Sequence, residues 1–176
     1  MAAANAFAFG EFQIYEGRTS YTMSQASIQN YFGELMTDFE GACYGQYFLE
    51  FADYYTRENA DGSDFLKLAY QSLRALLVPS LPRKLVRYIY ELKVLVVNGE
   101  CPPDFETLDI CQSTLYTLQY IAASPVEKLY TFQVSEEVLG ELRFVMNRYR
   151  QQYMEGHYRS REILEACVGL PGASGS

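Results

Sequence analysis

The sequence lacks tryptophan, and it contains only one histidine, His157, among its 176 residues. The four cysteines do not form a CxxC pair; they are Cys43, Cys101, Cys111 and Cys167. A structural zinc site needs four Cys or His ligands, usually supplied in close pairs. The inventory therefore predicts no metal and no other cofactor. It favours buried or unused thiols over a disulfide scaffold.

Long apolar segments are also missing, since no run approaches the ~18 residues that cross a membrane. The first residues, MAAANAFAFGEF, have neither the basic start nor the apolar centre of a signal peptide. We therefore expect no membrane partner and a cytoplasmic location.

Signatures of catalysis are absent as well, because the sequence contains no GxxxxGK[ST], GxGxxG, HExxH or GxSxG motif. The paired acids Glu136 and Glu137 stand at a predicted helix start, where carboxylates favour the helix dipole. His157 has no acid or nucleophile nearby in sequence. The chain is therefore predicted to be a binding protein and not an enzyme.

The charge is negative overall and unevenly distributed. The net charge is −8, which argues against dominant non-specific binding to nucleic-acid phosphates. Residues 34–64 contain eight acids against one arginine, whereas residues 83–93 contain four bases against one glutamate. Residues 143–161 contain five arginines against one glutamate. An acidic partner would have to meet one of these two basic segments.

The first thirty residues predict strands, because apolar residues alternate on both sides of a turn at Glu16-Gly17-Arg18. Two strands alone are marginal in water, so the hairpin must belong to a larger sheet or contact helices. If its edges lack partners, they become templates for association with other chains.

From Gly33 onward the apolar spacing becomes helical. One helix is predicted from Gly33 to Tyr54, and a second follows Ser63, which we expect to act as its cap. A third, largely buried helix begins at Pro82. The remaining predicted helices cover residues 108–122, 135–154 and 159–167. We predict a mainly α fold, an irregular bundle of about six helices with a short β remnant at the N-terminus.

Several segments resemble the RecO family of bacterial recombination mediators. Residues 9–21, FGEFQIYEGRTSY, resemble the last strands of the family's N-terminal oligonucleotide-binding barrel, and Gln25-Ala26 with Tyr31-Phe32 resembles the exit from it. The helical matches are YGQYFLEF at 44–51, LVRYIYELK at 85–93, PVEKL at 125–129 and RSREIL at 159–164. The resemblance implies a barrel remnant at 1–30, a RecO-like helical domain at 31–168 and a disordered tail at 169–176.

The sequence departs from the family in two places. Many members carry a zinc-binding element with two CxxC pairs after the central helix, but residues 99–107 contain only Cys101. The chain therefore resembles the zinc-less variants. Most of a barrel would precede Phe9 in a full member, so we expect DNA binding to be weak if the barrel is missing.

The resemblance also implies a function in DNA damage repair and homologous recombination. Family members act with RecR at gaps coated by single-strand-binding protein, help RecA to load there, and anneal complementary strands. The acidic C-terminal tail of single-strand-binding protein is a ligand of the helical domain. RecR, this tail and DNA are therefore the expected partners, at the bacterial nucleoid.

A tail of this kind needs cations for its carboxylates and an apolar pocket for its terminal ring. Arg83, Lys84 and Arg87 can share one helix face. We hypothesise a cationic rim for the tail or DNA made of Arg83, Lys84, Arg87, Lys93, Arg159 and Arg161.

Two other interpretations remain. The chain could be an assembly scaffold that contacts RecR only, and the acidic segment 34–64 would then be its informative surface. It could also be an unrelated helical regulator or a small enzyme with a pocket of scattered residues. Solvated helix faces would account for the basic residues without any binding role.

Overall fold

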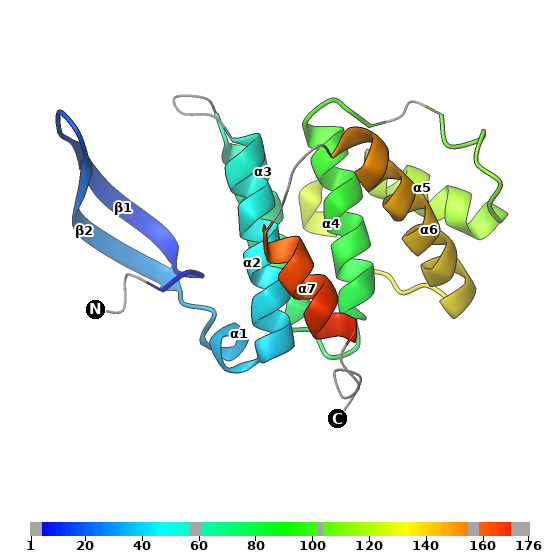
Figure 1. Ribbon diagram of the computed structural model, residues 1–176, viewed down its shortest axis with the longest axis horizontal. Helices are drawn as coiled ribbons and strands as arrows, with labels where there is room; N and C mark the ends of the chain where they lie inside the picture. Colours follow the sequence, from blue (N-terminus) through cyan, green and yellow to red (C-terminus); the bar gives the residue numbers. More distant parts are fainter. Residues whose placement is uncertain (1–4, 57–60, 102–103, 155–158, 170–176) are drawn as a thin grey trace.

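The computed structural model describes residues 5–56, 61–101, 104–154 and 159–169, with the side chains of 162–168 alone in the last segment. Two parts are evident in Figure 1: a β-hairpin that projects to one side, and a body of packed helices. The prediction of a mainly α fold with a short N-terminal β segment is confirmed.

The hairpin consists of β1 (Phe9–Glu16) and β2 (Tyr21–Asn30), which pair antiparallel. Cross-strand partners share a face, so Phe12 with Ala26 and Ile14 with Met23 give that face an apolar character. Ile14 and Met23 are half exposed or more, at 59% and 50%. The hairpin therefore presents an uncovered apolar face, and association through it stays a prediction.

Aromatic rings fasten the base of the hairpin to the helical body. Phe7 is buried, and its ring lies where a Cβ on Gly45 would be 2.7 Å away, so only glycine admits it. The ring of Phe9 lies 4.3 Å from that of Tyr70, and Phe32 meets the same ring edge-on at 5.6 Å. The body thus holds the hairpin at one end only.

The first predicted helix is divided in two. Helix α1 (Gly33–Thr37) ends at Asp38, whose extended backbone (φ −104°, ψ 103°) starts α2 (Phe39–Tyr55). The Asp38 carboxylate accepts a hydrogen bond from the Gly41 amide at 3.0 Å. The prediction of one helix from Gly33 to Tyr54 is wrong, because an aspartate in this place caps a new helix better than it continues the old one.

The next helices follow the predicted order. They are α3 (Ser63–Leu76), α4 (Arg83–Val97), α5 (Gln112–Ala123), the 3₁₀ turn η2 (Val126–Lys128) and α6 (Glu136–Tyr153). Ser135 caps α6 as its sequence position suggests, accepting from the Val138 amide at 3.3 Å. Ser63 is not the cap of α3, since Gly62 occupies that position.

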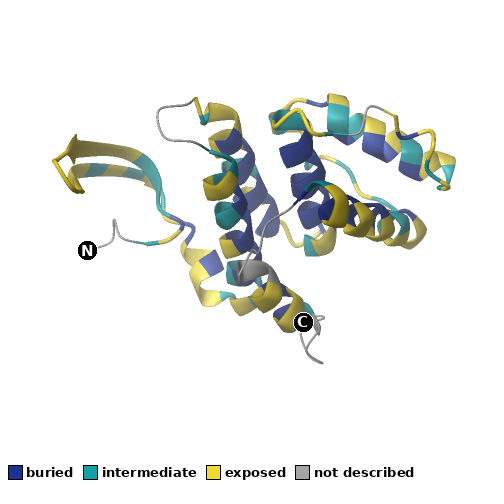
Figure 2. Ribbon diagram, turned by 45° about the horizontal axis from the view of Figure 1, so that its top comes forward, coloured by how far each residue is buried: buried dark blue, intermediate teal, exposed yellow. Residues whose placement is uncertain are grey.

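Helix α4 is the centre of the body and contacts α2, α3, α5 and α6. Every residue from Leu85 to Leu95 is buried, which Figure 2 shows as a continuous dark core. The predicted central burial of this helix is confirmed. Its buried segment includes Arg87, Glu91 and Lys93, so the core holds charges that need internal partners.

Helix α7 (Arg159–Gly169) packs against α2 at the C-terminal end of the chain. Some sequence predictions fall outside the described residues: the turn at 57–60, the loop at Pro102-Pro103, His157 and the tail from 170. Within the described segments, seven α-helices replace the expected six because α1 and α2 are separate.

Candidate partner-binding face

Arg83 joins the starts of two helices. Its guanidinium pairs with the Asp38 carboxylate, and its Nη1 lies 3.2 Å from Glu40 Oε2. Burial raises the pKa of Asp38, but the Gly41 amide and Arg83 outweigh burial and hold that pKa below its ordinary value. Arg83 is therefore neutralised by the beginning of α2.

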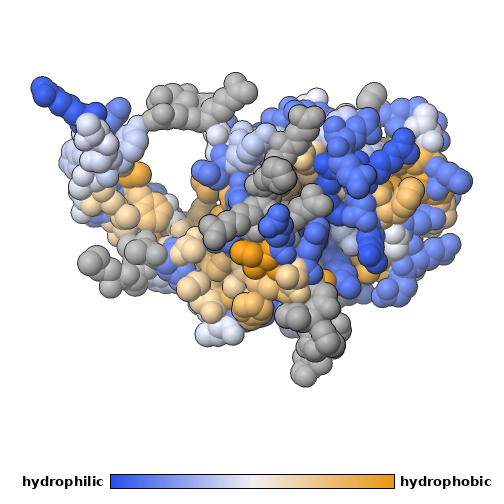
Figure 3. All heavy atoms as spheres, viewed as in Figure 1, coloured by the Kyte–Doolittle hydropathy of each residue, from blue (hydrophilic) through white to orange (hydrophobic). Residues whose placement is uncertain are grey.

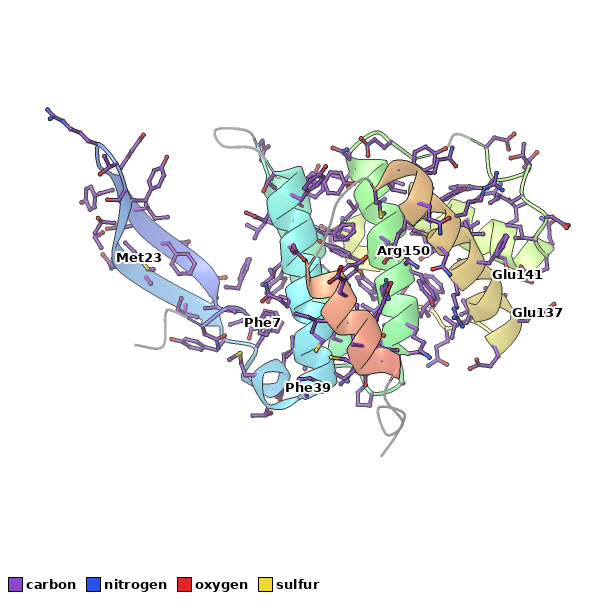
Figure 4. The ribbon with its side chains drawn as sticks, in the orientation of Figure 1. Phe7, Met23, Phe39, Glu137, Glu141 and Arg150 are labelled. Atoms are coloured by element: carbon purple, nitrogen blue, oxygen red, sulfur yellow. The ribbon has the colours of Figure 1, made fainter. Side chains whose placement is uncertain are left out.

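Arg87 and Glu91 belong to a buried polar cluster at the junction of α2, α4 and α6. Glu91 is fully buried and accepts from Arg87 Nε at 2.8 Å, Arg150 Nη1 at 2.5 Å and the Tyr47 hydroxyl at 2.6 Å. Figure 4 shows Arg150 reaching towards α4 from α6. Burial raises the pKa of Glu91, but Arg87, Arg150 and Tyr47 together bring it below its ordinary value.

The charge of Arg87 is directed into the protein. Its guanidinium lies 5.0 Å above the Tyr47 ring, and its Nη2 is 3.7 Å from the Glu165 carboxylate of α7. Only 8% of Arg87 is exposed. Arg87 therefore joins α4 to α2 and α7, and it is not available to an acidic partner at the surface.

Lys93 caps the end of another helix. Its ammonium donates to the carbonyls of Ser124 at 2.7 Å, Ala122 at 2.9 Å and Ile121 at 3.4 Å. These are carbonyls at the C-terminal end of α5 and its cap, which have no partner within the helix. Burial lowers the pKa of Lys93. Its role is structural.

The structure thus corrects the geometry of the hypothesised rim. Arg83 is held by two carboxylates, and Arg87 and Lys93 are buried with internal partners. Lys84 is exposed. The side chains of Arg159 and Arg161 lie outside the described residues. Of the rim, Lys84 is the residue that the structure leaves open to a ligand, and the binding role itself stays a prediction.

The outward side of α6 carries cations that this hypothesis did not include. Arg143 and Arg148 are exposed, and within the described residues neither forms an ion pair. Phe144 lies between them in sequence and is 64% exposed. Positions 143, 144, 147, 148 and 151 are all exposed and follow one side of the helix. We call these five residues the α6 face.

Lys84 is exposed in the first turn of α4, the helix against which α6 packs. Tyr88 is one turn after Lys84 on α4 and so shares its helix face. Burial raises the pKa of Tyr88 and Glu91 adds to that rise, whereas the charges of Arg87, Arg150 and Arg143 act against it. Figure 3 shows hydrophilic side chains gathered over the side where α4 and α6 lie.

The arrangement can bind an acidic, flexible ligand. Two guanidiniums offer paired donors to carboxylate or phosphate oxygens, and the exposed ring of Phe144 offers a surface for stacking. The acids of the same helix lie nearer its start, where Figure 4 shows Glu137 and Glu141 at the outer end. Glu141 is occupied by the Cys111 amide at 3.0 Å. The middle and end of α6 are therefore the part of the helix that would attract an acidic ligand.

The hypothesised rim includes Arg159 and Arg161 from the five arginines of 143–161, but not Arg143 or Arg148. The apolar spacing of α6 indicates which of these arginines face outward. The inward side of the helix is marked by Val138, Leu142, Val145 and Tyr149. Arg143 and Arg148 fall outside that stripe. Arg150 falls next to Tyr149 and is buried.

Two kinds of feature are absent from the described part of the chain. There, no group of three or more His, Cys, Asp or Glu side chains is placed to hold a metal ion. No helix of that part is long and apolar enough to cross a membrane.

A family model and several known proteins that this chain resembles all carry the name RecO or recombination protein O. The sequence model of the family described as "Recombination protein O C terminal" matches residues 36–107. A protein named DNA repair protein RecO from Acetivibrio thermocellus is 23% identical, over 94% of this chain and 78% of its own. A protein of the same name from Clostridium novyi is 25% identical over 82% of this chain, which spans 59% of that relative. Another from Caldicellulosiruptor bescii is 33% identical over 56% of this chain and 40% of its own.

Proposed function

The chain belongs to the RecO family, and from this premise we propose that it acts in DNA repair and recombination as a mediator without catalytic chemistry. It would act with RecR in the bacterial cytoplasm at DNA gaps coated by single-strand-binding protein. There it would help RecA to load and complementary strands to anneal. Such a mediator exchanges one set of binding contacts for another.

The observation that carries the proposal is the contrast in charge between α4 and α6. The cations of α4, apart from Lys84, are occupied within the body, whereas Arg143 and Arg148 face outward beside the exposed ring of Phe144. An acidic tail that ends in an apolar residue would find both cations and an apolar surface there. We therefore place the tail-binding region on the α6 face together with Lys84.

The hairpin supports a secondary DNA contact. A barrel strand turns one face to the barrel interior, and the apolar face of β1 and β2 has that character. We infer that residues 1–30 correspond to the last strands of an oligonucleotide-binding barrel.

Fluorescence anisotropy with two labelled ligands tests the proposal. One ligand is the acidic C-terminal peptide of single-strand-binding protein, and the other is a short DNA single strand. Replacing both Arg143 and Arg148 by alanine should weaken peptide binding about tenfold or more, as expected for losing charge-assisted hydrogen bonds. Wild-type binding should weaken with salt.

A matched control removes two exposed cations elsewhere. Lys67 and Arg74 lie on α3, and the pair Lys67→Ala with Arg74→Ala changes the net charge by the same amount. Equal losses in the two double variants would contradict a defined site on α6. If the wild-type chain binds neither ligand, the scaffold that contacts RecR only, through acids such as Asp53 and Asp64, becomes the better proposal.

A further inference from the structure

Two cysteines that are far apart in the sequence meet inside the body. Cys43 lies on the second turn of α2 and Cys167 lies near the end of α7, and their sulfur atoms are 3.0 Å apart. Both side chains are buried, at 9% and 6% exposed. The two sulfurs are about 1 Å further apart than the ~2.05 Å of a disulfide bond.

We propose that Cys43 and Cys167 are an oxidation site, at which a small disulfide such as oxidised glutathione links α7 covalently to α2. Among the described residues, no third His, Cys, Asp or Glu side chain joins the two thiols to form a metal-binding group. A disulfide is therefore the modification that this pair fits.

The reaction balances as two thiol–disulfide exchanges. The Cys167 thiolate attacks one sulfur of the small disulfide, forms a mixed disulfide and releases one small thiolate. The Cys43 thiolate then attacks the Cys167 sulfur and releases the second small thiolate. The two protons lost from the cysteines end on the two released thiolates, so two protein thiols are oxidised and one small disulfide is reduced.

The order of attack follows from the surroundings of Cys43. Burial raises the pKa of the Cys43 thiol to about 12, and the neighbouring Cys167, Glu40 and Asp38 act in the same direction. Cys43 is therefore a poor first nucleophile. It reacts second, when the mixed disulfide on Cys167 is held next to it and proximity compensates for its high pKa.

The position of the pair gives the modification a consequence. Apart from these sulfurs, α7 is held on the body by the fully buried Leu164 and by the Glu165 carboxylate, which lies 3.7 Å from Arg87. Helix α7 packs chiefly against one helix, α2, and a helix at the edge of the body opens more easily than a central one, which admits the oxidant to the buried thiols. Closing the link would fix α7 and hold Glu165 beside the buried Glu91 cluster. Disulfides in reducing compartments are typically transient and redox-sensing.

Peptide mapping of the whole chain tests the site. The protein is incubated with oxidised glutathione, and thiol–disulfide exchange is then stopped with acid. The remaining thiols are alkylated, and the digest is analysed by mass spectrometry. The expected product is an intramolecular Cys43–Cys167 link, with Cys101 and Cys111 alkylated, in a chain that stays monomeric on a non-reducing gel. Alkylation of all four cysteines, or a link that joins Cys101 or Cys111 instead, overturns the proposal.

Thermal unfolding gives a second readout. The link joins residues 124 positions apart in the sequence, so oxidation should raise the Tm by roughly 10 °C in the wild type and in Cys111→Ser. Cys167→Ser should show no rise. Amide hydrogen exchange in α7 should slow at least about tenfold on oxidation, since the helix can then open only with α2. An unchanged Tm and unchanged exchange in the linked wild type would overturn the structural role assigned to the link.

Discussion

Most of the basic residues of α4 lie in a different environment from Arg143 and Arg148 of α6. In α4, Arg87 and Lys93 are buried and bonded to internal acceptors, and Arg83 is paired with acids of α2. In α6, Arg143 and Arg148 are exposed and form no such pairs with the residues that the structure describes, while Arg150 turns inward. A run of cations therefore says little about binding until the position of each residue relative to the core is known.

The largest expected effect on stability comes from Glu91, at the centre of the buried polar cluster. Replacing Glu91 by alanine leaves two buried guanidiniums without their shared carboxylate, which should cost about 3–5 kcal/mol of unfolding free energy. Urea denaturation measures it. Glu137→Ala, an exposed acid on α6, should change stability by no more than about 0.5 kcal/mol. A small loss at Glu91 would mean that the cluster does not organise the body.

The same carboxylate should give stability a recognisable pH dependence. Because the pKa of Glu91 is lower in the folded chain than in the unfolded one, its contribution is present above about pH 4.5 and is lost as pH falls through the folded value. Arg87 and Tyr47 keep their protons throughout this range, because the pKa of each is raised. Glu91→Gln should therefore show a shallower loss between pH 5 and pH 3 than the wild type, measured by urea midpoints. Parallel curves would argue against the depressed pKa.

A smaller loss is expected at Lys93. Lys93→Met keeps the length of the side chain but removes the donor to three carbonyls at the end of α5, which should cost about 1–3 kcal/mol. Hydrogen exchange should show earlier opening of α5 than of α3. If Lys93→Met is as stable as wild type and binds the acidic peptide less well, the rim hypothesis for this residue regains support.

Arg83 should matter less, because its ion pairs are partly exposed. Arg83→Ala should cost about 1 kcal/mol, since the Asp38 cap and its bond to the Gly41 amide remain. Thermal unfolding at low and high salt would separate charge from packing, with the difference from wild type shrinking as salt rises. A salt-independent difference would point to lost packing of the arginine stem instead.

The smallest effect on stability belongs to the α6 face. Arg143→Ala with Arg148→Ala should change the unfolding free energy by no more than about 0.5 kcal/mol, because both side chains are exposed and neither pairs with an acid in the described part of the chain. The same variant is expected to show the largest loss of peptide affinity. Destabilisation comparable to that of Glu91→Ala would remove the distinction between the two segments.

The sequence by itself determined the mainly α class, the order of the helices after residue 61 and the central burial of α4. Apolar spacing alone is enough for these features, because it decides which side of each helix faces the core. The Ser135 cap and the N-terminal hairpin were also readable, since caps and turns depend on neighbouring residues.

Features that depend on contacts between distant residues were decided by the tertiary structure. The bonding of Arg83 to Asp38, of Arg150 to Glu91 and of Lys93 to the end of α5 joins residues that no local pattern connects. The meeting of Cys43 with Cys167 is of the same kind. Local spacing specifies the face that a side chain occupies, but packing of the helices decides whether that face meets water, an opposite charge or another sulfur.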